Sequence, residues 1–170
     1  MQLTTTSFQP GTEIPSYYTS DGEDASPELS WRDVPSNTQS FVLIVHDPDA
    51  PRPGGFTHWV VYNIPPETNH IAEDVPDTEV VSGLGMQGKN DGGRIGYMGP
   101  APPSGTHRYF FRLYALDMRL DLSVRATHKE YGIVRKTGLK WRMEENRIGA
   151  RRLRCERRRS CDRIIRYIAM

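Results

Sequence analysis

The sequence predicts an all-β domain made of two packed sheets. Three observations support this fold class: at least five short strand-like segments follow one another, loops rich in proline and glycine separate them, and almost no helical periodicity occurs before Thr127. With 170 residues, the chain is long enough to bury a full core as one domain.

The charges are distributed unevenly along the chain. The formal net charge is only +1, but residues 131–170 hold 13 of the 22 Lys and Arg and only 4 of the 21 Asp and Glu. That segment therefore carries a net charge of about +9, and residues 1–130 carry about −8. We expect a folded domain over residues 1–130 followed by an arginine-rich tail over residues 131–170.

Both cysteines, Cys155 and Cys161, belong to this tail. Without nearby histidines they are a poor set of metal ligands, and the pair is typical of free thiols in a reducing compartment. The sequence has no apolar run of roughly 18 residues, and its start, MQLTTTSF, lacks the pattern of a signal peptide. We therefore expect a soluble, cytoplasmic protein without a membrane span.

The first 40 residues alternate extended pieces with turn residues. Leu3 and Phe8 flank a threonine-rich segment of high strand propensity. In the segment SPELSWRDVP, Leu29 and Trp31 alternate with polar neighbours. This alternation predicts a half-buried strand that ends at Pro35, with Trp31 in the core.

The stretch HDPDAPRPGGFTHWVVYNIPP, residues 46–66, joins two predicted strands through a stiff polar loop. Apolar strands are expected at residues 41–45 and 59–64. The loop carries Asp47 and Asp49, and His58 lies at the start of the second strand. Three prolines restrict the loop and remove amide donors, so its polar groups are held in place. The two strands should bring both acids and the histidine to one rim, as in a binding site.

Residues 67–92 are polar and show little periodicity. Val80 and Val81 predict a short strand, and GLGMQGKNDGG predicts a long flexible loop. The glycines of this loop are not followed by a Lys-Ser or Lys-Thr pair at a helix start, so they do not predict a nucleotide-binding loop.

A second strand with a polar start is predicted at residues 109–116, after a proline- and glycine-rich loop at residues 99–105. His107 and Tyr109 are two residues apart and therefore point to the same side of an extended chain. His58 and His107 each precede an apolar strand and lie close to a proline-rich loop, which favours a shared functional role.

The segments HDPDAP, FTHWVVYNIPP and GYMGPAPPSGTHRYFFRLYALD, with the earlier TSDGEDASPELSW, resemble the phosphatidylethanolamine-binding protein family. They are most similar to its bacterial and archaeal branch of Raf-kinase-inhibitor-like proteins. The resemblance covers roughly residues 1–130. It implies a β-sandwich of antiparallel sheets with a few short peripheral helices and a small pocket for phosphate or phosphorylated head groups. It also implies a cis proline in the first loop, for which Pro51 is the candidate.

By motif position, the resemblance implies eight ligand-binding residues and no cofactor. They are Asp47, Asp49, Pro51, His58, Gly99, Pro102, His107 and Tyr109. Histidine nitrogens and the backbone amides beside Gly99 and Ala101 are expected to donate hydrogen bonds to the anion. Asp47 is expected to orient a histidine or to meet an ammonium group, and the Tyr109 hydroxyl to add a donor.

These expectations predict a non-enzymatic, regulatory protein. Its ligand would be a phosphorylated small molecule or a phospholipid head group, and it would inhibit a kinase or protease. The alternative is a metal-assisted phosphoester hydrolase that uses Asp47, Asp49, His58 and His107. No serine, cysteine or threonine is placed as an obvious nucleophile, which favours the first interpretation.

The family pattern ends near residues 126–130, and the tail that follows contains 11 arginines without a sustained amphipathic period. Our hypothesis is a shifted reading frame or a divergent replacement of the usual ending. The alternatives are an arm for nucleic acid or acidic lipid, and a solvated charged face. Sparse aromatic residues and the lack of a binding motif count against nucleic acid. A missing terminal helix would expose apolar surface and favour a homodimer.

Overall fold

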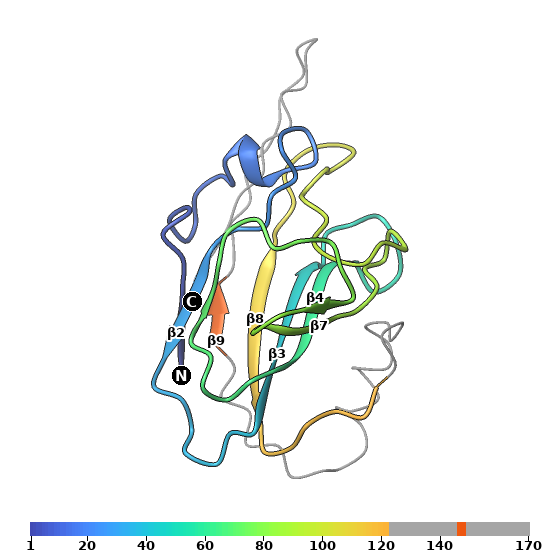
Figure 1. Cartoon of the computed structure of the whole chain (residues 1–170). Helices are drawn as coiled ribbons and strands as arrows, with labels where there is room; N and C mark the ends of the chain where they lie inside the picture. The colour runs from blue at the N-terminus through green and yellow to red at the C-terminus, as the bar shows by residue number, and fades with distance from the viewer. Residues whose placement is uncertain (123–145, 149–170) are drawn as a thin grey trace.

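The computed structural model describes residues 1–122 and 146–148 of the chain, and these form two antiparallel sheets (Figure 1). The smaller sheet has the strand order β1-β2-β5 and consists of β1 (Gln2–Thr4), β2 (Leu29–Arg32) and β5 (His70–Ile71). The helical element within the described residues is a single 3-10 turn, η1 (Ser16–Tyr18). The all-β prediction is therefore confirmed.

The larger sheet has the strand order β6-β7-β4-β3-β8-β9. Its strands are β6 (Val80–Val81), β7 (Gly85–Gln87), β4 (Phe56–Ile64), β3 (Ser40–Asp47), β8 (Phe110–Leu116) and β9 (Asn146–Ile148). The neighbouring strands pair antiparallel throughout, and β3 lies between β4 and β8 at the centre of the sheet.

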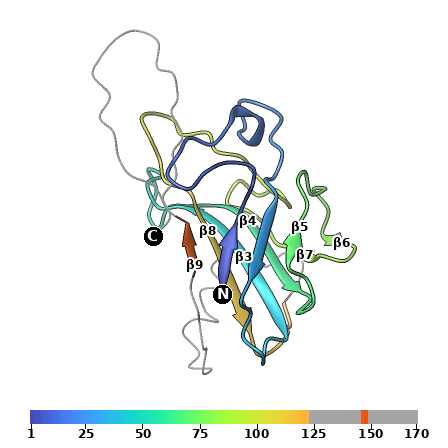
Figure 2. The ribbon, with the colours of Figure 1, turned by 90° about the vertical axis from the view of Figure 1, so that its left-hand side faces the viewer.

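The core lies between the two sheets, which Figure 2 shows one in front of the other. Leu3 and Trp31 of the smaller sheet belong to the same buried cluster as Phe41 and Trp59 of the larger one. The rings of Trp31 and Phe41 meet edge to face with their centroids 5.4 Å apart. The prediction that Trp31 is a core residue is confirmed.

Both faces of the central strands are covered, which explains why they are apolar without interruption. A second buried cluster, which includes Val42, Val60 and Tyr62, lies on the strand positions that alternate with those of the core. A strand that is buried on both faces gains from an apolar residue at every position, whereas a half-buried strand such as β2 alternates.

The prediction that GLGMQGKNDGG forms a long flexible loop is wrong in part. Residues 85–87 form β7, which pairs with both β4 and β6, and a further bridge joins Lys89 to Ile95. Gly85 has φ +122° and an added Cβ would lie 2.7 Å from the Tyr62 carbonyl oxygen, so its lack of a side chain allows close pairing with β4.

The expected cis bond before Pro51 is also wrong, because no peptide bond within the described residues is cis. The Arg52 amide instead donates to the Ala50 carbonyl over 2.7 Å, and the Gly55 amide donates to the Arg52 carbonyl over 3.1 Å. The first of these bonds closes a tight turn around Pro51, which suits the φ of a trans proline.

The hypotheses about the tail fall largely outside the described residues. Residues 146–148, which belong to the tail as predicted from the sequence, form β9 and pair with β8 in the register Phe111 to Ile148. The proposed domain boundary at residue 130 and the shifted reading frame stay predictions.

Candidate functional site

A pocket of about 300 Å³ lies where the start of β4 and the segment before β8 meet the proline-rich loop after β3. Seven of the eight predicted residues line it, namely Asp47, Pro51, His58, Gly99, Pro102, His107 and Tyr109. The structure adds Ala50, Arg52, Phe56, Met98, Ala101 and Pro103 to the lining. Asp49 is the predicted residue that does not line the pocket.

Asp47, at the end of β3, connects the loop to the pocket. Its Oδ1 accepts hydrogen bonds from the amides of Asp49 and Ala50 over 2.8 and 3.1 Å, which closes the first turn of the loop. Its Oδ2 lies 2.7 Å from Nδ1 of His107, and the two residues are only 2% and 7% exposed. Because Nδ1 is engaged by the carboxylate, His107 keeps Nε2 for a ligand.

Asp49 has a different role from the one expected. Its Oδ2 accepts from the backbone amide and Nε of Arg108 over 3.0 and 2.7 Å, and its Oδ1 accepts from the terminal nitrogen over 2.6 Å. These hydrogen bonds from Arg108 lower the pKa of the Asp49 carboxyl and keep it charged. The pair ties the loop after β3 to the segment before β8, and so holds the two sides of the pocket together.

His58 does not offer the donor to the ligand that the sequence analysis expected, because its N–H is used within the protein. Its Nδ1 lies 2.6 Å from the carbonyl oxygen of Met98, so Nδ1 carries the proton and Nε2 is left as an acceptor. Burial lowers the pKa of His58, which keeps the imidazole neutral near pH 7. The rings of Phe56 and Tyr109 pack against it at centroid distances of 4.7 and 5.1 Å.

Gly99 lines the pocket, but its backbone does not offer the amide donor that we expected. Its N–H donates to Oδ1 of Asp24 over 2.5 Å, and its carbonyl accepts from the Ser20 hydroxyl over 2.8 Å. A Cβ at this position would lie 2.7 Å from a backbone atom of Thr19, so close packing requires glycine here. Gly99 therefore shapes the wall of the pocket.

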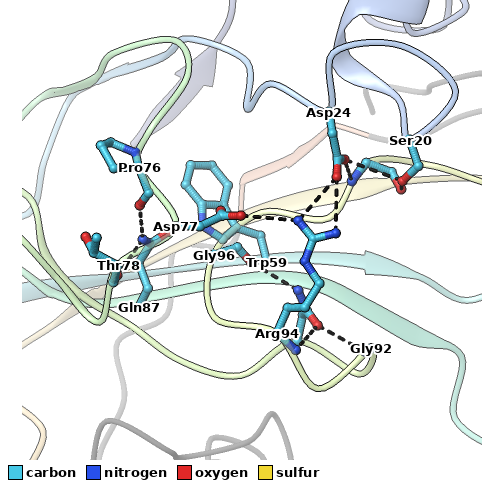
Figure 3. Close-up of polar contacts among 12 residues, drawn as sticks. Ser20, Asp24, Trp59, Pro76, Asp77, Thr78, Gln87, Gly92, Arg94 and Gly96 are labelled. Atoms are coloured by element: carbon cyan, nitrogen blue, oxygen red, sulfur yellow. Dashed lines mark hydrogen bonds and ion pairs between the residues drawn. The ribbon is translucent and has the colours of Figure 1, made fainter.

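The Asp24 carboxylate that holds Gly99 is in turn held by Arg94 (Figure 3). The guanidinium of Arg94 lies 3.4 Å from Asp24 and 3.2 Å from Asp77, so one side chain links three loops. No motif in the sequence marked these residues, because they are 70 and 17 positions from Arg94 and meet only in the folded chain.

Tyr109 is buried, and its hydroxyl remains a neutral donor. Burial raises the pKa of the phenol well above its ordinary value, and the nearby Asp47 carboxylate raises it further. The floor of the pocket therefore combines the neutral His58, the oriented His107 and a phenol, all within a mostly apolar wall.

Arg52 is the charged lining residue that the sequence analysis missed. It stands inside the quoted loop DAPRPGG, so an arginine between two prolines was the signal that could have identified it. Its guanidinium lies 5.4 Å from the centre of the Phe56 ring.

Clusters of metal-ligating side chains and membrane-spanning helices are both absent from the described residues. In this part of the chain, no three or more His, Cys, Asp and Glu side chains gather in a way that could hold a metal ion. Nor does any helix there have the length and apolar character needed to cross a membrane.

Comparison with known proteins agrees with the pattern of the motifs. The family model for phosphatidylethanolamine-binding protein matches residues 4–155. A UPF0098 protein of Methanothermobacter thermautotrophicus is 52% identical over 130 residues, which are 76% of this chain and 85% of the relative. A UPF0098 protein of Aquifex aeolicus is 53% identical over 133 residues, which are 76% of this chain and 77% of the relative.

Two solved structures share the fold. A phosphatidylethanolamine-binding protein homologue of Chlamydia trachomatis superposes with a TM-score of 0.73 at 34% identity, covering 91% of this chain and 97% of that one. YbcL of Escherichia coli, described as a member of the mammalian family, gives a TM-score of 0.78 at 28% identity, covering 90% and 98%. The chain therefore belongs to the phosphatidylethanolamine-binding protein family.

Proposed function

We propose that this protein binds phosphate or a phosphorylated head group in the pocket beside Asp47 and His107, without transforming it. The observation that carries the proposal is the 2.7 Å contact between Asp47 Oδ2 and His107 Nδ1 in a nearly fully buried pair. This contact orients the free Nε2 of His107 before a ligand arrives. The Tyr109 hydroxyl is a donor for an anionic oxygen, and the positioned Nε2 of His107 can exchange a hydrogen bond with the same ligand, so the ligand meets groups that need little reorganisation.

The neutral His58 favours a ligand that also carries a donor. Its Nε2 is an acceptor and suits an N–H or O–H group, such as the ammonium of ethanolamine or a protonated phosphate oxygen. At about 300 Å³ the pocket is large enough for a head group and too small for acyl chains. A phosphorylated head group has both the anion and the donor that these side chains call for.

A regulatory role follows from binding without chemistry. A pocket that retains a phosphorylated group can sequester it, or can hold a phosphorylated segment of a protein and thereby inhibit a kinase or protease.

The arrangement of the acids gives no specific support to the metal-assisted hydrolase. Asp47 faces His107, whereas Asp49 turns away to Arg108, so the two carboxylates do not converge on one point. A metal-assisted mechanism needs its carboxylate ligands around one ion.

The test is calorimetric titration of O-phosphorylethanolamine and of inorganic phosphate into the full chain. We expect saturable binding that is lost in His107→Ala and retained in His70→Ala, which removes an exposed histidine on β5. Phosphorus NMR of the mixture should show the ligand unchanged after prolonged incubation. Wild-type affinity in His107→Ala would refute the proposed site, and release of phosphate would favour the hydrolase.

A further inference from the structure

The pocket contains one permanent positive charge within the part of the chain that the structure describes. Among the described residues that line it, Arg52 is the one arginine or lysine. Arg108 lies nearby, but three hydrogen bonds to Asp49 occupy it. The buried Asp47 contributes a negative charge beside His107, and His58 is neutral. Any anion that enters the pocket therefore depends on Arg52 to offset repulsion from Asp47.

The side chain of Arg52 is free to turn toward a ligand. It is 46% exposed, and its nearest carboxylate, Oδ1 of Asp91, is 3.9 Å from the guanidinium. The pair is long and its Arg52 side is half exposed, although Asp91 is only 17% exposed, so leaving Asp91 carries a modest penalty. The backbone of Arg52 stays in place through its bonds to Ala50 and Gly55, and the Phe56 ring supports the guanidinium from one face.

We propose that Arg52 sets the charge preference of the pocket, which selects phosphomonoesters, with two negative charges, over phosphodiesters, with one. The proposal rests on the phosphate-binding function proposed above and adds the ligand class. The attraction between Arg52 and the ligand grows in proportion to the charge of the ligand. If removal of Arg52 weakens the binding of a dianion about tenfold, it should weaken the binding of a monoanion only about threefold. The monoanion loses half of the interaction energy, and half of the energy corresponds to the square root of the change in Kd.

The experiment compares two esters that share one head group. O-Phosphorylethanolamine is a monoester and is dianionic at about pH 8, since the second phosphate pKa is about 6. Glycerophosphoethanolamine is a diester and carries one negative charge on its phosphate. Both are titrated into the full chain at low salt, so that screening of an exposed arginine stays weak.

Four variants are compared with the wild-type protein. Arg52→Gln should lower monoester affinity about tenfold and diester affinity about threefold. Arg52→Lys should retain the preference for the monoester. Asp91→Asn should raise monoester affinity, because it removes the competing carboxylate and keeps an oxygen for the Thr57 amide, now 2.8 Å away. Arg119→Gln, beyond the far end of β8, should change neither affinity.

The results distinguish a failure of the proposed Arg52 role from a failure of the proposed phosphate-binding function. Equal weakening of both esters in Arg52→Gln, or no weakening, would overturn the role of Arg52 while leaving the pocket as a phosphate site. A wild-type protein that binds neither ester would refute the proposed function, and the inference with it. Unchanged thermal unfolding in Arg52→Gln would show that lost affinity reflects the missing charge.

Discussion

The most demanding prediction concerns Gln87, a polar side chain with 0% exposure in the core. Its Oε1 accepts from Nε1 of Trp59 over 2.6 Å, and its Nε2 donates to the carbonyl oxygens of Pro76 and Thr78 over 2.7 and 2.8 Å (Figure 3). One amide thus satisfies an indole in β4 and two carbonyls of the loop before β6. Substitution of Gln87 by Met, which has a similar shape, removes all three bonds at once.

The size of the stability loss in Gln87→Met depends on how deeply each hydrogen-bond partner of Gln87 is buried. The indole N–H of Trp59 is fully buried and would lose its partner, at about 1–3 kcal/mol. The two carbonyls lie in partly buried bonds and can reach water, so we assign each about 0.5–1 kcal/mol. Burial of the apolar Met side chain stabilises the variant by about 1 kcal/mol and so offsets part of this loss. We therefore expect Gln87→Met to lower the free energy of unfolding by about 1–4 kcal/mol.

Urea denaturation of the full chain measures this change. For a slope of about 2 kcal/mol per M, the midpoint should fall by about 0.5–2 M. The control is Gln9→Met, the same substitution at an exposed position, for which we expect almost no change. In the background of Trp59→Phe the indole is absent, so Gln87→Met should be less destabilising by about 1–3 kcal/mol. A loss below about 1 kcal/mol in Gln87→Met, with an unchanged slope, would refute the reasoning.

Three further predictions test the supports of the pocket. Gly99→Ala places a Cβ 2.7 Å from backbone of Thr19, so a thermal scan should show a loss of about 1–3 kcal/mol, and wild-type stability would contradict the packing. A double-mutant cycle of Asp49→Ala and Arg108→Ala should give a coupling of about 1–2 kcal/mol, reduced from that of a buried pair by solvent exposure; additive losses would contradict a clamp. Because burial lowers the pKa of His58, the unfolded chain takes up a proton below about pH 6.5 while the folded chain does not, so stability should fall on acidification by at most about 1.4 kcal/mol per pH unit. His58→Asn should lack this fall, and parallel curves for the two proteins at about pH 5.5–7.5 would exclude the effect.

Local patterns were enough to predict β2, β3, β4, β6 and β8 and the polar residues that border the longer strands. The uninterrupted apolar runs became β3 and β4, which are buried on both faces, and the alternation around Trp31 became β2. The polar residues that border these strands, Asp47, His58 and His107, line one pocket, as adjacency to antiparallel strand ends predicts. These features depend on residues close in sequence, so a linear pattern contains them.

Local patterns did not predict the strand β7 or the burial of Gln87. Glycines at positions 83, 85, 88 and 92–93 indicated a flexible loop, yet residues 85–87 pair with two strands. A buried glutamine without an apolar neighbourhood in sequence gives no sign of its burial, and only the contact with Trp59 explains it.

The sequence by itself determined which central segments become strands and which polar residues lie at their ends, because strand period and proline stiffness are properties of neighbouring residues. Only the tertiary structure decided what each polar group does. Asp49 binds Arg108, 59 positions away, and His58 donates to a carbonyl 40 positions away, so one became a clamp and the other a neutral acceptor. Hydrogen bonds are directional and short, and their partners are chosen by how distant segments pack to within a few tenths of an ångström.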